Sequence, residues 1–486
     1  MSVERYATLA DGRKLPYMET DSPPRGGMKY TYFAPDKSYV VQFFNEPEQG
    51  RDPNMQNRLQ AIIGRYNPTI SEENGGALGG DALTAKYFGR LFCWPQATVT
   101  SPEFGIVCPT YPKNFFFKKE SSDCLSLKGK DKRSYWFTSP KTRSYLNPAE
   151  LGDFRSMLSV SLKLARAVRR MHQAGLAHSD LSGNNVLIDP MSGDCVVIDI
   201  DSLVVPGLFA PEVAGTKGYI APEVVDSMNL PTGDPRRVVP NIKTDLFALP
   251  VLIYQYLLCR HPLVGPKIHA ADPDEDDFLS CGRGALFIEN PLDTSNRPPD
   301  LKVTVDSLGL ALSRLFMTAF VDGLHDPPLR PTALEWEKAL SKTYDLLQPC
   351  SNCSAKWFVL DDAGRPVCPF CGKKIPSGTA LRFLLHKTRQ EKPGLWRRYD
   401  ELNIYSGREL YSWHFSPQIF ENEKAADREV KAKVVRENGT WYLLNQSLCA
   451  LRSEGGNLVP PGGALWLREG AVFQAGDVVI EVKTVG

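Results

Sequence analysis

Apolar and polar residues near the start of the chain alternate in short runs that are typical of β-strands. The runs Lys29–Phe33 and Tyr39–Phe44 flank the turn residues Pro35-Asp36 and follow the pair Gly26-Gly27. This pattern predicts a β-hairpin with a glycine-rich entry. We expect further strands in residues 90–100 and 103–111, and a helix over residues 54–66, where apolar positions recur at helical spacing.

Helical patterns dominate the next two hundred residues. The longest covers residues 148–174, where Leu158, Leu162 and Ala165 share one apolar stripe and Gly175 marks the end. Further helices are expected near residues 245–258, 307–321 and 332–347, and residues 118–145 are expected to form a loop insertion. Strands followed by helices predict an α+β region of roughly 340 residues.

The pattern changes again near the C-terminus, where short strand-like runs are separated by glycine, proline and asparagine turns. The expected strands are residues 411–415, 430–435, 440–444, 464–467 and 478–482. Such spacing predicts a small all-β sandwich.

Composition narrows the possible classes of protein. With 486 residues the chain should divide into several domains. The net charge of +1 gives no reason to expect binding to nucleic acid or to an anionic membrane, and no apolar run is long enough to span a bilayer. The N-terminal residues do not resemble a secretory signal.

Four of the 11 cysteines form one cluster. Cys350 and Cys353 make one Cys-x-x-Cys pair, and Cys368 and Cys371 make a second pair 14 residues later. Four thiolates at this spacing predict a tetrahedral structural Zn²⁺ site in a zinc ribbon. The remaining cysteines are isolated, which favours reduced thiols: Cys93, Cys108, Cys124, Cys195, Cys259, Cys281 and Cys449.

Three segments carry a recognisable catalytic spacing. They are His178 to Asn185, then Asp199-Ile200-Asp201, then Gly215 to Glu223, which ends in Ala-Pro-Glu. The order and spacing resemble the protein kinase superfamily. The resemblance implies that Asp180 accepts the proton of the attacking hydroxyl, and that Asn185 and Asp199 hold Mg²⁺ or Mn²⁺ beside the phosphates of ATP.

The same resemblance implies a structural frame around these residues. Glu223 would pair with Arg330, Asp245 would hold the backbone of the catalytic loop, and His178 would support that loop from within. Thr216 and Tyr219 would shape the floor that faces the substrate.

Several positions depart from the usual kinase pattern. Ser179 replaces the arginine that commonly precedes the catalytic aspartate, so activation by a phosphate bound at that arginine is not expected. Ser182 replaces a lysine that touches the γ-phosphate, and Ile200-Asp201 replaces an aromatic residue and glycine.

The largest departure is in the small lobe. Gln42 stands where a strand lysine should bind the phosphates, and a neutral amide cannot replace an ammonium group there. Lys29, on the neighbouring strand, is the nearest cation, as in the with-no-lysine kinases. We hypothesise that Lys29 reaches the phosphates; the alternative is a solvated strand residue. The helix over 54–66 offers Gln56 and Gln60 but no glutamate as partner.

These observations predict a two-lobed kinase fold followed by a zinc ribbon and a β-sandwich. The expected domains are residues 1–345 (small lobe 1–110, large lobe 111–345), 346–378 and 379–486. ATP would bind between the lobes against Gly26, Gly27, Lys29 and the hinge residues Pro109, Thr110 and Tyr111.

The C-terminal region faintly resembles forkhead-associated domains, which bind phosphothreonine. Gly407-Arg408, His414 and residues 441–445 fall in a similar order, but the spacing from Arg408 to His414 is too short. A phosphopeptide ligand is one expectation, and His414 is read as a structural histidine.

Over its whole length the chain is similar to the bacterial Ser/Thr kinase of tellurium-resistance-linked signalling triads. The resemblance implies stress signalling, a protein substrate, and two partners: a cognate phosphatase and a von Willebrand factor A protein. The alternatives are a nucleotide-binding pseudokinase scaffold and, disfavoured by Gly215-Thr216 and Ala-Pro-Glu, a small-molecule kinase.

Overall fold

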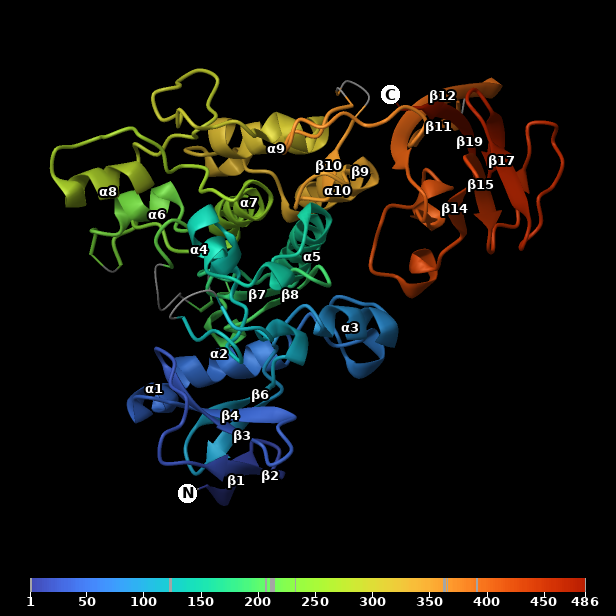
Figure 1. Cartoon of the computed structure of the whole chain (residues 1–486). Helices are drawn as coiled ribbons and strands as arrows, with labels where there is room; N and C mark the ends of the chain where they lie inside the picture. Colours follow the sequence, from blue (N-terminus) through green and yellow to red (C-terminus); the bar gives the residue numbers. More distant parts are fainter. Residues whose placement is uncertain are drawn as a thin grey trace. The chain divides into compact units, whose positions relative to one another are not determined.

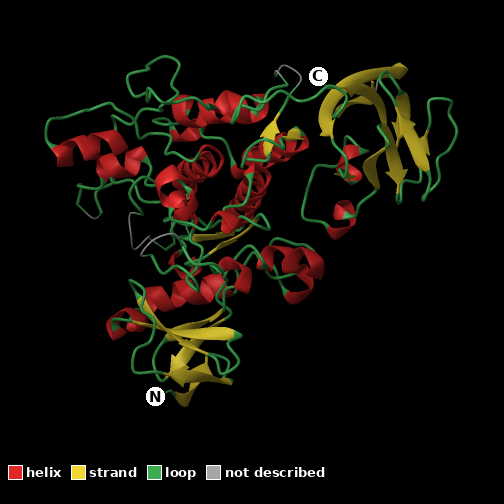
Figure 2. Cartoon of the chain, viewed as in Figure 1, coloured by secondary structure: helices red, strands yellow, loops and turns green. Residues whose placement is uncertain are grey.

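The computed structural model describes residues 2–121, 125–205, 208–209, 215–231, 233–361, 364, 366–389 and 392–485 (Figures 1 and 2). Cys124 lies outside these ranges. The chain divides into two compact units. The first comprises Met1–Gly152, Lys163–Pro299 and Met317–Leu334, and the second comprises Asp153–Leu162, Asp300–Phe316 and Glu335–Gly486.

The N-terminal part of the first unit is a closed antiparallel barrel with the strand order β1-β2-β3-β4-β6-β5. Its strands are β1 (Val3–Leu9), β2 (Lys14–Glu19), β3 (Lys29–Phe33), β4 (Tyr39–Phe44), β5 (Ala97–Ser101) and β6 (Gly105–Pro109). Strand alternation sorts the side chains of β4: Val41 and Phe43 fill the barrel, whereas Val40 and Phe44 pack outside it.

Three helices accompany the barrel: α1 (Pro47–Arg51), α2 (Pro53–Ile63) and α3 (Ala82–Gly89). Helix α2 begins after Asp52, whose side chain accepts a hydrogen bond from the Asn54 backbone, and Pro53 occupies the first helical position. Met55 and Leu59 of α2 pack on the outer face of β4, so the helix lies along the barrel (Figure 1).

The remaining elements up to residue 345 are mainly helical. They are α4 (Pro140–Ser144), α5 (Phe154–Gln173), β7 (Val186–Asp189), β8 (Asp194–Val197), α6 (Pro222–Ser227), α7 (Ile242–Leu258), α8 (Pro273–Cys281), α9 (Leu310–Met317) and α10 (Ala333–Asp345). The apolar stripe of α5 is fully buried, as its spacing predicts. Helix α7 is apolar on all sides and almost completely buried, which makes it the central helix of the region.

The second unit ends in three antiparallel sheets. A two-stranded sheet joins β9 (Leu347–Pro349) to β10 (Trp357–Val359). A five-stranded sheet has the order β12-β11-β19-β18-β16, and a four-stranded sheet has the order β13-β14-β15-β17. Phe383 and Ile480 of the larger sheet share one core with Val434 and Leu443 of the smaller sheet.

The bounds of these C-terminal strands are β11 (Leu381–Arg389), β12 (Lys392–Ile404), β13 (Glu409–Leu410), β14 (Ala432–Glu437), β15 (Thr440–Asn445), β16 (Leu451–Arg452), β17 (Ala464–Leu467), β18 (Val472–Ala475) and β19 (Val478–Thr484). The strand predicted for residues 411–415 is wrong, because Ser412–His414 form a 3₁₀ turn. The His414 ring accepts a hydrogen bond from the Tyr411 backbone at 2.9 Å, which closes the turn locally.

No helix within the described ranges has the length and apolarity needed to cross a bilayer. The ten cysteines of those ranges form no disulfide.

Candidate active site

Asp180, on the loop between α5 and β7, accepts hydrogen bonds from two side chains, those of Asn185 and Thr216. The Asn185 amide donates to the Asp180 backbone oxygen and to its Oδ2, both at 2.8 Å. The Thr216 hydroxyl donates to Oδ1 at 2.7 Å. Each carboxylate oxygen therefore has one fixed donor. Because the Asn185 nitrogen faces Asp180, its side-chain oxygen is the atom left to act as a ligand.

Asp199 is brought to this loop by a short hairpin. Strands β7 and β8 are antiparallel, with Val186 opposite Val197, and the Ile198 backbone donates to the Asn185 oxygen at 2.9 Å. Asn185 and Asp199 therefore lie at the same end of the hairpin. Asp199 has φ 61°, a left-handed conformation that turns the chain away from β8.

The charge at this end of the hairpin is strongly negative. Burial away from water raises the pKa of the Asp199 carboxyl, and the negative charge of the neighbouring Asp201 carboxylate raises it further. Lys29 and His178 act in the opposite direction, and Asp180 adds to the increase. Clustered oxygen ligands that repel one another are a site that a divalent cation stabilises.

Hydrogen bonds of buried polar residues hold the loop that carries Asp180 in place. The His178 backbone donates to Asp245 Oδ2 at 2.7 Å, and its ring nitrogen Nε2 lies 3.0 Å from the Ile198 oxygen. Asp245, on the first turn of α7, is 1% exposed and also lies 3.1 Å from the His172 ring. Through Asp245 and His178, the loop that carries Asp180 and the segment just before Asp199 are both connected to α7.

Glu223 at the start of α6 forms a bidentate ion pair with Arg330. The two guanidinium nitrogens donate to Oε1 at 2.8 Å and to Oε2 at 2.7 Å. Arg330 also donates to the backbone oxygens of Gly323, Leu324 and Lys243. This arrangement fixes the end of the Ala-Pro-Glu segment.

Ser182 is completely buried, and its hydroxyl accepts a hydrogen bond from the Asn184 backbone at 3.3 Å. It therefore stabilises the loop and does not face a ligand. Tyr219 is similarly occupied: its hydroxyl donates to Gln255 at 2.7 Å, and burial raises its pKa to about 12. Thr216, expected on the substrate-facing floor, instead contacts Asp180 directly.

Lys29 lies at the start of β3, is 9% exposed, and forms a buried ion pair with Asp201. The register of the hairpin pairs Lys29 with Phe44 and Thr31 with Gln42, so Lys29 and Gln42 share one face of the sheet. The Gln42 amide donates to the Thr31 hydroxyl at 3.1 Å. The structure therefore excludes the solvated-strand alternative for Lys29.

The backbone that we predict to bind the nucleotide comprises the turn before β3 and the residues at the end of β6. The Asn45 amide donates to the oxygens of Gly26 and Gly27, each at 3.1 Å, which fixes the turn before Lys29. At the end of β6, the Cys93 thiol donates to the Pro109 oxygen at 3.4 Å. The Thr110 backbone donates to Ser38 at 3.3 Å, so this stretch already has protein partners for two of its polar groups.

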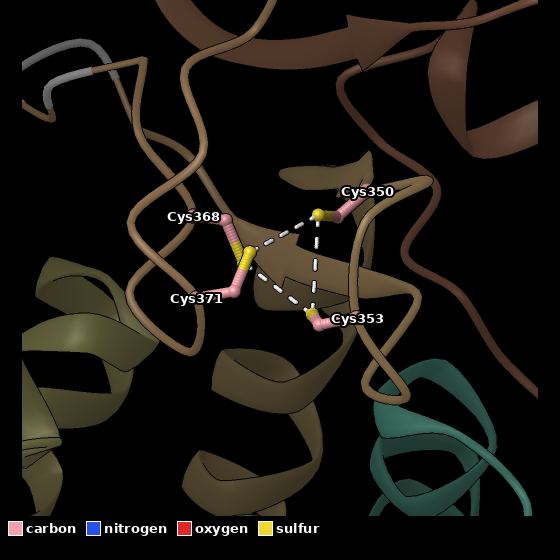
Figure 3. Close-up of side chains that lie close together, drawn as sticks. All are labelled: Cys350, Cys353, Cys368 and Cys371. Atoms are coloured by element: carbon pink, nitrogen blue, oxygen red, sulfur yellow. Dashed lines mark hydrogen bonds between the residues drawn. The ribbon is translucent and has the colours of Figure 1, made fainter.

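The four clustered cysteines of the second unit converge on one point (Figure 3). Three of their Sγ–Sγ separations are 3.7, 3.9 and 3.9 Å. A tetrahedral Zn²⁺ with Zn–S bonds of about 2.3 Å would place its sulfur ligands about 3.8 Å apart. The donor set and its dimensions therefore fit zinc.

Backbone geometry shapes the second cysteine pair. The Gly372 backbone donates to the Cys368 oxygen at 2.8 Å, and Gly372 has φ 72°, a conformation that favours glycine. Hydrogen bonds from the Lys373 backbone and the Asn352 side chain lower the pKa of the Cys371 thiol to about 7. Both features favour a thiolate directed at the centre of the cluster.

Arg408, considered above for phosphopeptide binding, contacts Asp345 instead, and His414, expected to be a structural histidine, contacts the same residue. The Arg408 guanidinium donates to Asp345 Oδ1 at 2.5 Å and to its backbone oxygen at 3.2 Å. The His414 ring nitrogen lies 3.0 Å from the same Oδ1. Both side chains are buried, so their geometry is that of structural residues.

Residues 142–283 match the Pkinase family, described as the protein kinase domain. The chain is 31% identical over 138 residues to the anti-Muellerian hormone type-2 receptor of Homo sapiens, covering 24% of this chain and 23% of that protein. It is 25% identical over 155 residues to the serine/threonine-protein kinase RAD53 of Saccharomyces cerevisiae, covering 31% and 18%.

A third relative is a putative serine/threonine-protein kinase of Mycoplasma pneumoniae, 26% identical over 142 residues, covering 26% of this chain and 36% of that protein. A rhoptry kinase structure from Toxoplasma gondii has 14% identity and a TM-score of 0.40, covering 71% and 84%. The chain spans about a quarter of the length of the curated relatives it matches first. These findings support a protein kinase domain with Ser/Thr kinases among its relatives.

Asp201 is the site residue whose role sequence reasoning missed. The sequence pattern marks Asp201 only as a departure from the usual glycine, whereas in the structure it forms an ion pair with Lys29. Two features of the sequence together could have indicated this contact. They are the aspartate two positions after Asp199 and the lack of glutamate in the helix that was expected to supply the partner.

Proposed function

We propose that this protein is an ATP-dependent serine/threonine protein kinase. The observation that carries the proposal is the fixed arrangement of Asp180, Asn185 and Asp199 within a segment that matches the protein kinase domain. Phosphoryl transfer depends chiefly on positioning and charge neutralisation; these rigidly held oxygen ligands would supply the positioning and would hold the metal ion that neutralises charge.

In the proposed mechanism, Asp180 orients the attacking hydroxyl and receives its proton, while Thr216 and Asn185 keep its carboxylate in place. The Asn185 side-chain oxygen and the Asp199 carboxylate would hold Mg²⁺ or Mn²⁺, which when bound neutralises charge on the phosphates. Lys29 would contact the phosphates of ATP, and the backbone of residues 109–111 would contact the base.

The test is phosphoryl transfer from labelled ATP to the chain itself and to a generic protein acceptor, with sites read by mass spectrometry. Asp180→Asn should lower kcat by about 10²- to 10⁴-fold, because it removes the base while keeping the size and shape of the side chain. Asp11→Asn, at an exposed turn between β1 and β2, is the matched control. Equal transfer by wild type and Asp180→Asn would overturn the proposal.

A nucleotide-binding pseudokinase scaffold is the second candidate function. It is favoured by one observation: Lys29 has Asp201 as its partner, and helix α2 contains no acidic residue. Nucleotide binding without transfer to any acceptor would support this alternative.

Further parts of the proposal concern the second unit and the partners. We propose that Cys350, Cys353, Cys368 and Cys371 hold one structural Zn²⁺, supported by their sulfur–sulfur distances. Bacterial stress signalling in the cytoplasm, with a cognate phosphatase and a von Willebrand factor A protein, rests on the resemblance alone. Phosphopeptide binding by the forkhead-associated-like tail would need residues other than Arg408 and His414.

A further inference from the structure

The small lobe lacks the usual anionic partner for a phosphate-binding lysine. In protein kinases that partner is a helix glutamate, whose ion pair must form for activity. Helix α2 has the sequence Pro-Asn-Met-Gln-Asn-Arg-Leu-Gln-Ala-Ile-Ile, without an acidic residue. Its Gln56 amide donates to the Gly50 oxygen at 2.8 Å, so that side chain is directed back along its own segment. Another element must orient the lysine.

Asp201 meets Lys29 from the segment that carries Asp199. The Lys29 ammonium donates to Asp201 Oδ2, and the two side chains are 10% and 11% exposed. Lys29 Nζ also lies 5.9 Å from the centre of the Phe44 ring. A flexible lysine held between a carboxylate and an aromatic face has one defined position.

Charge keeps Lys29 in its cationic form despite burial. Burial alone lowers the pKa of Lys29, but the carboxylates of Asp201 and Asp199 outweigh burial and raise the pKa overall. Lys29 therefore remains an ammonium group beside the candidate metal ligand, and the group that a polyphosphate requires is preserved.

We propose that Asp201 is the positioning residue that aligns Lys29 on the phosphates of ATP, in place of a helix glutamate. The inference rests on the proposed function of this site as a nucleotide site. Asp201 is separated from Asp199 by one residue, so the pair couples Lys29 to the metal-binding segment and not to α2. Correct alignment of Lys29 and Asp199 then becomes a single event, independent of the position of α2.

The experiment uses the full chain and an acyl-phosphate derivative of ATP that acylates lysines next to the phosphates. Mass spectrometry should find Lys29 as the labelled lysine in the wild type, with protection by excess MgATP. Asp201→Asn should lower labelling of Lys29 and the kcat/KM for MgATP by about 10- to 100-fold, the usual effect of losing a residue that orients a ligand. Asp201→Glu, which keeps the charge, should restore part of both.

Asp194→Asn is the matched control, because Asp194 forms another lysine–aspartate pair with Lys163, at the far end of β8. It should leave labelling and kcat/KM unchanged. Unchanged Lys29 labelling in a folded Asp201→Asn variant would overturn the inference.

A double-mutant cycle keeps the inference testable if Asp201→Asn alone does not fold, since removing both buried charges is tolerated better than removing one. If Asp201 acts through Lys29, then Lys29→Met and Lys29→Met/Asp201→Asn will bind a fluorescent ATP analogue equally. A further loss in the double variant would make Asp201 a ligand in its own right and overturn the positioning role. If the wild type is labelled at Lys29 but transfers no phosphoryl group, the proposed kinase function fails and the role of Asp201 stands. If the wild type transfers a phosphoryl group but another lysine is labelled, the kinase function stands and the role of Asp201 fails.

Discussion

Buried charges in the first unit occur as pairs whose partners are far apart in sequence. Lys29 with Asp201 and Glu223 with Arg330 are the two pairs that frame the candidate active site. Taking a charge out of water is costly, and a pair offsets this cost only when its geometry is good and its remaining hydrogen-bonding groups are satisfied. Arg330 meets both conditions, because every direction of its guanidinium group has an acceptor.

Replacing Arg330 should therefore destabilise the protein strongly. Arg330→Ala leaves Glu223 without its bidentate partner and three backbone oxygens without a donor, so the free energy of unfolding should fall by about 3–5 kcal/mol. Urea denaturation followed by circular dichroism measures this change. Arg236→Ala, which breaks the pair with Asp234, should leave the free energy of unfolding almost unchanged, because solvent screens this pair. Equal effects of the two substitutions would contradict this assignment.

At this scale the sequence predicted which residues lie together at one hairpin end and the pairing of Glu223 with Arg330, but it did not predict the contact between Lys29 and Asp201. The spacing of Asp180, Asn185 and Asp199 identified one hairpin end, because local spacing determines what a short hairpin brings together. The Lys29–Asp201 contact spans 172 positions and depends on how β3 packs against the segment that follows β8, which no local pattern encodes.

At the scale of elements, periodicity was informative wherever burial is one-sided. Strands β3 and β4 match the predicted ranges and helix α5 ends within one residue of its predicted end, because alternating or helical stripes separate a buried from an exposed face; α5 begins at Phe154, later than the predicted residue 148. Residues 411–415 also alternate in polarity, yet the His414 side chain bonds to the backbone of its own turn and competes with a strand. Strands β11 and β12 were not predicted.

The segment that carries the four clustered cysteines has an apolar core in addition to its candidate metal ligands. Phe358, Leu360, Ala380 and Val485 form an apolar cluster with Cys350 and Cys368, and the Phe370 ring lies 5.3 Å from the Phe154 ring. Because this core remains without metal, loss of zinc should loosen residues 346–378 locally and should not unfold the second unit.

Metal analysis and hydrogen exchange test this expectation. The purified chain should contain about one zinc per molecule, by the fourfold thiolate site. Chelation, or Cys353→Ser, should increase amide exchange across residues 346–378 while the strands from β11 to β19 stay protected. Cys449→Ser is the control, since Cys449 is an exposed, isolated thiol. A metal-free chain with unchanged exchange would argue against a structural zinc.

At the scale of the whole molecule, Asp345 joins distant segments of the second unit. It ends helix α10 and binds both Arg408 and His414, which flank β13. Burial alone would raise the pKa of Asp345, but the charges and hydrogen bonds of His414 and Arg408 outweigh burial and lower the pKa below its usual value. The unfolded chain therefore binds a proton at Asp345 more readily than the folded chain does.

The sign of the pH dependence follows from this difference. The stabilisation contributed by Asp345 is present above its ordinary pKa of about 3.9 and is lost as the pH falls through the lower folded-state value. Asp345→Asn should cost about 3 kcal/mol at pH 7, and the difference from wild type should shrink steadily below pH 4. Urea denaturation from pH 7 to pH 2.5 measures it, with Glu437→Gln at the exposed end of β14 as control. A difference that stays constant with pH would contradict the linkage.

The separation of Lys29 from Asp201 has a consequence for how the protein is made. Ribosomes add about 5–20 residues per second, so the 172 positions between the two partners take about 10–30 s to synthesise. During that interval the barrel strands are complete to β6, but the cation on β3 has no carboxylate to meet and must remain hydrated. On the nascent chain, the face of the barrel that carries Lys29 therefore stays open to water until the hairpin of β7 and β8 and the following Asp201 have emerged.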